Sequence, residues 1–466
     1  MTNSGGHLDC FKAYDVRGQI PGELNDGMAE LIGRAYAKLV NPSRVAVGRD
    51  IRLTSPALQA ALIRGLTVSG VDVVDIGLVG TEQVYFATFA LGLDGGIMVT
   101  ASHNPRDYNG MKFTRAGARP ISADTGLKDI EAMLATAMGL RTGPDLPATP
   151  LAGGKAGTVE KKDIYPEYVD HLLTYVEVDR LKPLKIVVNA GNGGAGAVLD
   201  RLESRLPFRF VKLNHQPDGS FPNGVPNPLL PENRAVTSEA VVREKADLGL
   251  AWDGDFDRCF FFDHTGQFVE GYYLVGLLAQ RALERYPRAK IVHDPRLVWN
   301  TLEVVAQAGG VAVESKSGHA FIKERMREED AVYGGEMSAH HYLREFSYAD
   351  SGMIPWLQIV QMISETGRSL SDMVVERVRR YPVSGEINRE LADPAGALAR
   401  LKQTYGPRAL KIDEIDGFSF EYDNWRCNVR TSNTEPVVRV NLETRADEAL
   451  LASKTEEILA FLDRTL

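Results

Sequence analysis

The sequence predicts an α/β protein of several domains, followed by a smaller α+β unit at its C-terminal end. Two observations predict it. Amphipathic helical patterns alternate with short apolar strands over most of the chain, and such alternation is typical of sheets layered with helices. The chain also has 466 residues, which at the usual domain size corresponds to roughly three or four domains.

The first predicted domain covers residues 1–148. Helical patterns over 24–40 and 55–69 alternate with predicted strands at 44–48, 71–76 and 96–100. A stretch rich in Gly, Pro, Ala and Thr follows over 142–158 and has the composition of a linker.

Three further domains are predicted, over residues 149–248, 249–366 and 367–466. Strands are expected at 185–189, 208–213, 248–252, 259–262, 290–293, 311–314 and 331–333, with helices between them and a long apolar helix within 352–366. From about residue 368 the pattern changes to helices mixed with short strands near 387, 418 and 437–442. This change predicts the α+β unit.

The composition excludes several classes of function. The net charge is −9, from 53 basic and 62 acidic residues, so nothing indicates a nucleic-acid binder, which would need a basic face. No stretch approaches the roughly 18 consecutive apolar residues of a membrane helix. The N-terminus lacks the pattern of a signal peptide. Three well-separated cysteines, Cys10, Cys259 and Cys427, indicate reduced thiols in a cytosolic protein.

One polar motif stands directly after a predicted strand. Residues 100–105 read TASHNP, so Ser102 lies at the C-terminal end of that strand, where open α/β sheets bind their ligands. A serine hydroxyl is a weak nucleophile that needs a base or a metal to activate it. From these residues alone, Ser102 is either such a nucleophile or part of a Ser/Asn turn that only caps the chain.

An acidic loop, residues 253–258 (DGDFDR), follows the apolar strand at 248–252. The carboxylates of Asp253, Asp255 and Asp257 can converge on a hard divalent cation such as Mg²⁺, and Arg258 suits a phosphate beside that metal. An EF-hand loop would have Gly and Glu where Arg258 and His264 stand. A phosphatase of the haloacid dehalogenase kind would have Thr or Val at position 257. A solvated acidic turn is the remaining alternative.

Two more loops carry groups that suit a sugar phosphate. Residues 334–340 (GGEMSAH) place Glu336 and Ser338 two positions apart, where they can bond to vicinal hydroxyls or simply form a buried turn. Residues 430–436 (RTSNTEP) combine Arg430 with hydroxyl and amide side chains, which together form a good cradle for a phosphate dianion. A Ser/Thr-rich turn without a ligand is the alternative for the second loop.

A glycine-rich turn over 191–196 (GNGGAG) fits the GxGxxG pattern of dinucleotide-binding proteins. Such a site also needs an acidic residue at the end of the next strand, but Asn214 and His215 follow the strand at 208–213. We therefore interpret these glycines as a tight turn.

Three basic side chains are further candidates for a role in catalysis. They are Arg17, Lys112 and His319, and His319 shares a helix face with Lys323 at the i, i+4 spacing. Proton transfer to or from a sugar hydroxyl needs such a group nearby, although in isolation each of these residues would usually be an ordinary surface residue.

Taken together, the four loops resemble those of the α-D-phosphohexomutase superfamily, and the resemblance runs from Phe11 to Glu443. Within the superfamily, four runs resemble bacterial phosphomannomutases: 11–15 (FKAYD), 227–232 (NPLLPE), 335–342 (GEMSAHHY) and 348–355 (YADSGMIP). Two departures bear on substrate preference. Ala339 stands where many relatives have Gly, and Arg296 where some have Lys.

This resemblance implies three similar α/β domains with mixed sheets and a C-terminal α+β domain around a central cleft. It implies that Ser102 is a phosphoserine and that Asp253, Asp255 and Asp257 bind Mg²⁺ together with the Ser102 phosphate. Groups near the reacting oxygen, acting as acid, base or charge stabiliser, would be Arg17, Lys112 and His319. Substrate contacts would come from Arg258, Arg296, Glu336, Ser338, Arg430, Ser432, Asn433 and Thr434.

The implied activity is the reversible conversion of mannose 6-phosphate to mannose 1-phosphate, with a hexose 1,6-bisphosphate as intermediate and activator. Phosphoglucomutase, alone or as a second activity, is the main alternative. A metal-dependent sugar phosphatase or an inert sugar-phosphate binder is more remote, and phosphoglucosamine mutase fits the GEMSAH loop less well. We expect a cytoplasmic monomer or weak dimer that acts on a small-molecule hexose phosphate, not on nucleic acid or membrane.

Overall fold

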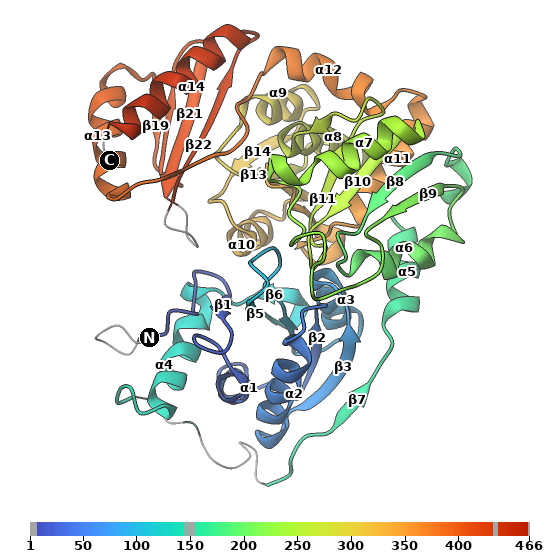
Figure 1. The fold of residues 1–466 in the computed structure, drawn as a ribbon, viewed down its shortest axis with the longest axis vertical. Coiled ribbons are helices and arrows are strands. Elements are labelled where there is room, and N and C mark those ends of the chain that lie inside the picture. The colour runs from blue at the N-terminus through green and yellow to red at the C-terminus, as the bar shows by residue number, and fades with distance from the viewer. Residues whose placement is uncertain (1–6, 144–145, 147–153, 432–436, 465–466) are drawn as a thin grey trace. The chain divides into compact units, whose positions relative to one another are not determined.

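The computed structural model describes residues 7–143, 146, 154–431 and 437–464, and the chain divides into two compact units. Unit 1 comprises residues 1–268 and 349–366, and unit 2 comprises residues 269–348 and 367–466. The sheets of unit 1 lie in the blue and green parts of Figure 1, and those of unit 2 in the yellow to red parts.

The first sheet of unit 1 has the spatial order β1-β5-β4-β2-β3-β7, with β6 paired to β5. It is mixed, as predicted, because β2 pairs in parallel with β3 and β4 whereas β5 pairs antiparallel with β1 and β4. Its elements are β1 (Val16–Gln19), α1 (Asp26–Val40), β2 (Arg44–Arg49), α2 (Ser55–Val68), β3 (Asp72–Leu78), α3 (Thr81–Ala90), β4 (Gly95–Val99), β5 (Tyr108–Arg115), β6 (Arg119–Pro120), α4 (Lys128–Ala137) and β7 (Val159–Lys161).

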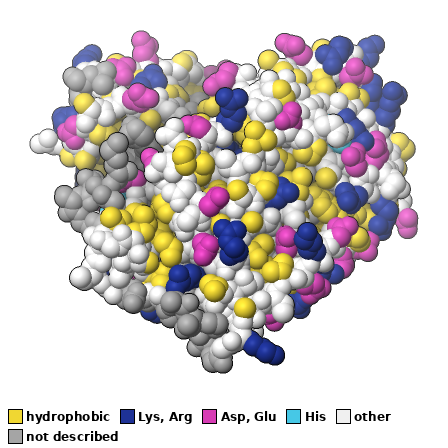
Figure 2. Space-filling model, turned by 60° about the horizontal axis from the view of Figure 1, so that its bottom comes forward, with side chains coloured by type: hydrophobic (Ala, Val, Ile, Leu, Met, Phe, Trp, Pro, Cys, Tyr) yellow, Lys and Arg dark blue, Asp and Glu magenta, His cyan; other side chains and the backbone are white. Residues whose placement is uncertain are grey.

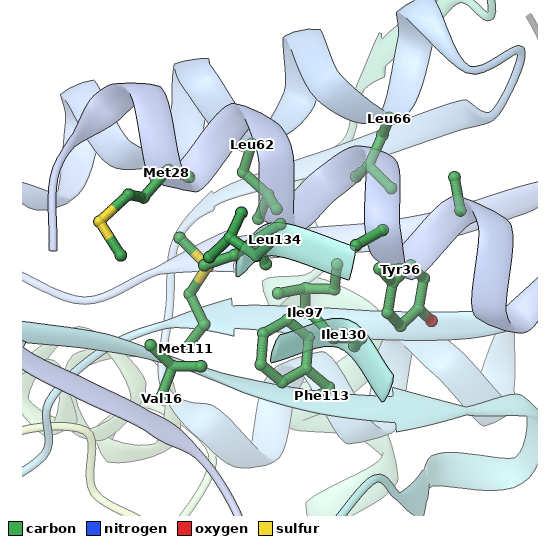
Figure 3. Close-up of a cluster of buried hydrophobic side chains, with 14 of the residues drawn as sticks. Val16, Met28, Tyr36, Leu62, Leu66, Ile97, Met111, Phe113, Ile130 and Leu134 are labelled. Carbon is green, nitrogen blue, oxygen red and sulfur yellow. The ribbon is translucent and has the colours of Figure 1, made fainter. Parts of the chain in front are cut away.

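Helices α1, α2 and α4 cover one face of this sheet with apolar side chains. Leu62 of α2 and Tyr36 of α1 lie over Ile97 of β4 and Phe113 of β5, all of them nearly inaccessible to solvent (Figure 3). Burying a side chain of this size contributes about 1.5–3 kcal/mol. The strand that leads to Ser102, β4, therefore rests on a well-packed core.

The second sheet of unit 1 has the order β12-β11-β10-β8-β9. Its elements are α5 (Tyr165–Leu173), β8 (Lys185–Asn189), α6 (Ala195–Glu203), β9 (Arg209–Leu213), α7 (Ala235–Glu244), β10 (Leu248–Trp252), β11 (Cys259–Phe262) and β12 (Phe268–Val269). β10 pairs in parallel with β8. The domain boundary expected at 248/249 thus separates strands that the structure pairs, because local patterns do not reveal a pairing between strands so distant in sequence. The boundary expected at 148/149 lies outside the described residues.

The chain returns to unit 1 at residues 349–366, with β17 (Ala349–Asp350) and the apolar helix α11 (Ile354–Thr366). The buried carboxylate of Glu82, at the start of α3, accepts the backbone N–H of Gly352 at 2.6 Å and the hydroxyl of Tyr168. Trp252, the last residue of β10, donates its indole N–H to the carbonyl of Gly352 at 3.0 Å. Residues 349–366 are therefore hydrogen-bonded to α3, which belongs with the first sheet of unit 1, and to β10 of its second sheet.

In unit 2, the first sheet includes β14-β13-β15-β16, in which β13 pairs in parallel with both β14 and β15. Its elements are α8 (Gly271–Arg285), β13 (Lys290–His293), α9 (Trp299–Gln307), β14 (Val311–Glu314), α10 (His319–Glu329), β15 (Tyr333–Gly335), β16 (His341–Leu343) and α12 (Leu370–Arg380). The strand predicted at 331–333 begins two residues later than expected.

The second sheet of unit 2, in the order β18-β22-β21-β20-β19, is wholly antiparallel. Its elements are β18 (Ile387–Glu390), α13 (Pro394–Tyr405), β19 (Lys411–Asp413), β20 (Phe418–Glu421), β21 (Trp425–Thr431), β22 (Val437–Thr444) and α14 (Glu448–Asp463). This is the predicted α+β part of the chain, with its own apolar core.

All three cysteines are buried and free of disulfides. Within the described residues, none of the helices combines the length and apolarity that crossing a bilayer requires. On the face shown in Figure 2, basic and acidic side chains are interspersed, which fits the modest net charge of −9.

Candidate active site

The Ser102 loop begins where β4 ends. Ser102 is buried, and its backbone has a φ of 48°, in the left-handed region that a residue with a Cβ adopts at a cost of about 1–2 kcal/mol. Its N–H donates to the hydroxyl of Thr100 at 2.9 Å. Strained, buried turns of this kind are typical of functional sites, because the surroundings must hold them in place.

The hydroxyl of Ser102 points at the acidic loop. Its Oγ donates to Oδ2 of Asp253 at 2.9 Å, and Nδ1 of His103 lies 3.1 Å away. Nη2 of Arg258 lies 3.4 Å from the same oxygen. The structure thus brings together a serine, a carboxylate and a guanidinium from two segments far apart in the sequence.

The three aspartates of the acidic loop converge as the sequence predicts. Asp253, Asp255 and Asp257 are buried, and each offers a carboxylate oxygen within 4.8 Å of the others. Oδ1 of Asp255 is buried and accepts no hydrogen bond from the described residues. A cluster of hard oxygen ligands with an unsatisfied buried oxygen fits a divalent cation such as Mg²⁺.

Lys112, on β5, places its ammonium among these carboxylates. Nζ lies 2.8 Å from Oδ2 of Asp255 and 2.6 Å from Oδ2 of Asp257. Burial disfavours the charged lysine, but the two carboxylates outweigh burial and raise the pKa of Lys112 above its usual value. The side chain therefore carries a fixed positive charge inside the cluster.

The carboxylates respond to this environment in different directions. Burial and the neighbouring charge of Asp255 raise the pKa of Asp257 well above its usual range. Burial acts on Asp255 as well, but Lys112 and a hydrogen bond from Thr81 at 2.5 Å hold its pKa below the usual value. The negative charge of Asp255 is thus stabilised, whereas a charge on Asp257 is costly, and a divalent cation bound beside these carboxylates would offset that cost.

Arg258 and Arg17 approach the serine loop from two sides. Arg258 pairs with Oδ2 of Asp253 at 2.7 Å and donates to Nδ1 of His103. Burial, and then the charge of Arg258, lower the pKa of His103 well below its usual value, so its imidazole is neutral at neutral pH. Arg17, just inside β1, donates to Asp15 at 2.7 Å and to the side chain of Asn104.

The glycine-rich turn at 191–196 supports the acidic loop, consistent with its interpretation as a tight turn. The N–H of Gly194 donates to the carbonyl of Gly254 at 3.3 Å. A Cβ on Gly193 would stand 2.8 Å from the Gly254 carbonyl, and one on Gly194 would stand 2.9 Å from the ring of Phe256. The small residues are needed because the acidic loop packs directly on this turn.

A second cluster of predicted residues lies in unit 2. Arg296 donates through Nη2 to Oγ of Ser338 at 3.2 Å and lies 3.3 Å from Oε1 of Glu336. Glu336 also accepts the N–H of Gly318 at 2.8 Å, directly before α10. Burial raises the pKa of Glu336, although Arg296 opposes this shift. His319, the first residue of α10, is buried beside this group, with Lys323 Nζ 3.4 Å from its Nδ1.

Arg430 joins this second cluster through Glu386. Oε2 of Glu386 lies 3.3 Å from both Arg296 and Arg430, and its Oε1 lies 3.4 Å from Arg439. The expected loop at 430–436 needs correction at its start, because Arg430 and Thr431 close strand β21, where pairing with β22 extends it. The other predicted members of this cradle, Ser432, Asn433 and Thr434, lie outside the described residues.

Some residues of these clusters were missed by the sequence analysis. His103 stands inside the TASHNP motif, and its adjacency to Ser102 was an available signal. Thr81 and Glu386 carried no local signal, because they approach Asp255 and Arg296 only through the fold.

Comparison with protein families gives a consistent result over most of the chain. Four models of the phosphoglucomutase/phosphomannomutase family match in sequence order: alpha/beta/alpha domain I at residues 9–139, domain II at 166–266, domain III at 270–381 and the C-terminal domain at 386–460.

Individual relatives agree with this. A phosphomannomutase of Escherichia coli is 56% identical over 461 residues, covering 98% of this chain and 99% of its own. A protein of Xanthomonas campestris described as phosphohexose mutases is 57% identical, covering 97% and 98%. The crystal structure of a phosphoglucomutase/phosphomannomutase family protein from Burkholderia thailandensis, 30% identical, matches 100% of this chain and 98% of its own with a TM-score of 0.86. The chain therefore belongs to the phosphoglucomutase/phosphomannomutase family.

Proposed function

We propose that this protein is a phosphomannomutase that interconverts mannose 6-phosphate and mannose 1-phosphate. The observation that carries the proposal is the Ser102 hydroxyl, held 2.9 Å from Asp253 within a buried group of three carboxylates beside Lys112 and Arg258. High identity over nearly the whole chain to a phosphomannomutase of Escherichia coli supports this choice of substrate.

In the proposed reaction, phosphorylated Ser102 transfers its phosphoryl group to a hydroxyl of the hexose monophosphate. The bond between phosphorus and the serine oxygen breaks, a bond to the sugar oxygen forms, and a hexose 1,6-bisphosphate results. The other phosphoryl group of this bisphosphate then returns to Ser102, and the isomeric monophosphate leaves. Mg²⁺, held by Asp253, Asp255 and Asp257, would neutralise charge on the transferring group.

The residues of unit 1 would stabilise this transfer electrostatically. Lys112 keeps its positive charge because two carboxylates surround its ammonium. Arg258, already within 3.4 Å of the serine oxygen, is placed to contact phosphoryl oxygens on that side chain. We assign Arg17 to charge stabilisation on the same loop, and His319 of unit 2 to proton transfer at the sugar hydroxyl.

The residues of unit 2 would bind the sugar and its second phosphate. Glu336 and Ser338 offer an acceptor and a hydroxyl to the sugar, with Arg296 bonded to Ser338 and paired with Glu336. Arg430, with Ser432, Asn433 and Thr434, is assigned to the phosphate that is not being transferred. A guanidinium fork suits this dianion because it donates two parallel hydrogen bonds.

Intact-mass analysis tests the serine assignment. The purified protein, incubated with glucose 1,6-bisphosphate, should gain the mass of one phosphoryl group, and Ser102→Ala should not gain it. Ser220→Ala, in an exposed turn, should behave like the wild type. Wild-type mutase activity in Ser102→Ala would contradict the proposed mechanism.

Phosphoglucomutase activity is the second candidate, because the relative of Xanthomonas campestris is described more broadly, as phosphohexose mutases. Parallel measurement of kcat/KM for mannose 1-phosphate and glucose 1-phosphate distinguishes a specific from a dual enzyme. A sugar phosphatase would instead release inorganic phosphate without phosphorylating Ser102.

A cytoplasmic location and a monomeric or weakly dimeric state belong to the same proposal, and light scattering of the purified protein tests the latter.

A further inference from the structure

A buried arginine lies beneath the loop that carries Ser102. Arg52 follows β2, and only 1% of its surface is exposed. Its Nη2 donates to the carbonyl oxygens of Ser102 at 2.9 Å and Asn104 at 2.6 Å. Its Nη1 donates to the carbonyl oxygens of Pro105 at 2.7 Å and Tyr108 at 2.9 Å. One guanidinium therefore binds three carbonyls of the Ser102 loop and the carbonyl of Tyr108, the first residue of β5.

Arg52 is itself held firmly. Its backbone N–H donates to Oδ1 of Asp50 at 3.0 Å, and its Nε lies 3.5 Å from Oδ2 of the same carboxylate. Ser55, at the start of α2, donates to Asp50 at 2.6 Å. The ring of Phe221 lies 5.2 Å from the guanidinium carbon. The Arg52 side chain is thus held by Asp50, which also accepts a hydrogen bond from Thr100, and by the ring of Phe221.

The acidic loop comes close to the same carbonyl oxygen from another direction. A Cβ on Gly254 would stand 2.8 Å from the carbonyl oxygen of Ser102, which also accepts from Arg52. The left-handed backbone of Ser102 persists only if its surroundings hold it. Arg52 and Gly254 both contact the carbonyl group of Ser102, and these contacts can hold its backbone in that conformation.

We propose that Arg52 is the positioning residue that orients the Ser102 hydroxyl toward Asp253 for phosphoryl transfer. It acts through the loop backbone, since its hydrogen bonds go to carbonyls and not to Oγ. This inference rests on the proposed function. Arginine is required because its rigid planar fork holds several carbonyls at fixed angles, whereas a lysine ammonium is a flexible point charge.

The test compares Arg52→Lys with Arg234→Lys. Arg234 is a matched control because it also binds two loop carbonyls, those of Pro228 and Leu229, at 3.1 and 2.6 Å. We expect kcat of R52K to fall about 100-fold, the cost of displacing a reacting group by about 1 Å, with little change in KM. Backbone amide exchange in residues 100–108 should become faster in R52K, and R234K should show neither change.

The inference stands only if both kcat and amide exchange change in R52K and not in R234K. Unchanged exchange in 100–108, or a loss of kcat no larger than that of R234K, would overturn it. If the wild type proves inactive as a mutase, the proposed function fails, while the exchange measurement still decides whether Arg52 orders the loop. Should R52K not fold, Phe221→Leu, which removes the ring beside the guanidinium and none of its hydrogen bonds, carries the same two measurements with smaller expected changes.

Discussion

Two carboxylates with little solvent exposure, Asp257 in unit 1 and Glu386 in unit 2, respond to their surroundings in opposite ways. Burial and the adjacent Asp255 raise the pKa of Asp257 well above its usual range. Burial acts on Glu386 too, but Arg296, Arg439 and Arg430 outweigh it and lower its pKa. Asp257 lies beside other carboxylates, a surrounding that suits a cation, whereas Glu386 lies among three guanidiniums, a group that suits a phosphate.

The most severe test of this contrast is to remove one carboxylate from the first cluster. Asp255→Asn should lower kcat at least about 100-fold, because a bound metal ion contributes several kcal/mol to stabilising the transferring group. Steady-state kinetics across a Mg²⁺ titration measures it. Asp218→Asn, at an exposed turn, is the control and should keep normal kinetics. Mg²⁺-independent activity in D255N would mean that the cluster does not serve as the cation site.

The second cluster is tested by removing its carboxylate. Glu386→Gln should tighten the binding of inorganic phosphate by about tenfold, because the three guanidiniums lose a charged internal partner worth about 1.5–3 kcal/mol. Isothermal titration calorimetry measures the Kd. Glu303→Gln is the control, since Glu303 also pairs with two arginines, Arg377 at 2.9 Å and Arg380 at 2.6 Å. Weaker phosphate binding in E386Q would refute the assignment of an anion site there.

Packing beneath the acidic loop gives a smaller effect. Gly194→Ala places a methyl group 2.9 Å from the Phe256 ring and should destabilise the protein by about 1–3 kcal/mol, the usual cost of overpacking. It should also weaken Mg²⁺ binding, because Asp255 and Asp257 flank Phe256. Gly22→Ala, with no atom within 4 Å of the new Cβ, should leave both properties unchanged. Urea denaturation with and without Mg²⁺ distinguishes the two variants.

A further effect, confined to acidic pH, concerns the stability of unit 2. Burial lowers the pKa of His341 to about 3, from about 6.5 in an unfolded chain. Between pH 6.5 and pH 3 the unfolded state therefore binds a proton at His341 and the folded state does not. The free energy of unfolding is highest above pH 6.5 and falls by up to about 1.4 kcal/mol per pH unit toward pH 3. His341→Asn keeps an acceptor for the Tyr333 hydroxyl, now 2.7 Å from Nδ1, and should lose less stability between pH 6.5 and 4. The measurement is the free energy of unfolding as a function of pH, and His264→Asn, at an exposed position, is the control. The same dependence on pH in His341→Asn and in the wild type would contradict this prediction.

The sequence predicted the apolar strands of this fold best. The predicted bounds of β8, β10, β11, β13 and β14 match the structure, because each is a short apolar run. The pattern at 108–115 did not indicate β5, whose Tyr-Asn-Gly start and Lys112 make it locally polar. It forms a strand because β1 and β4 pair with it on either side.

The residues of the candidate site also fall into two groups, those that local sequence predicts and those that only the fold brings together. Asp253, Asp255 and Asp257 lie together because they belong to one short loop, and their convergence was predictable from spacing. Lys112 lies on β5 of another sheet and Thr81 begins helix α3, so no local pattern reveals their approach to Asp255. Arg52 was missed for the same reason, because its partners are backbone carbonyls, which no side-chain motif records.

The return of residues 349–366 to unit 1 has a consequence for synthesis on the ribosome. The Glu82 carboxylate in α3 accepts a hydrogen bond from the N–H of Gly352, a residue that is translated 270 residues later. Unit 1 therefore cannot reach its final packing until the chain has been translated beyond Thr366, although the whole of residues 269–348 is translated before then. A nascent chain that stalls within unit 2 would expose the surfaces meant for α11, and it would be a natural substrate for chaperones until translation resumed.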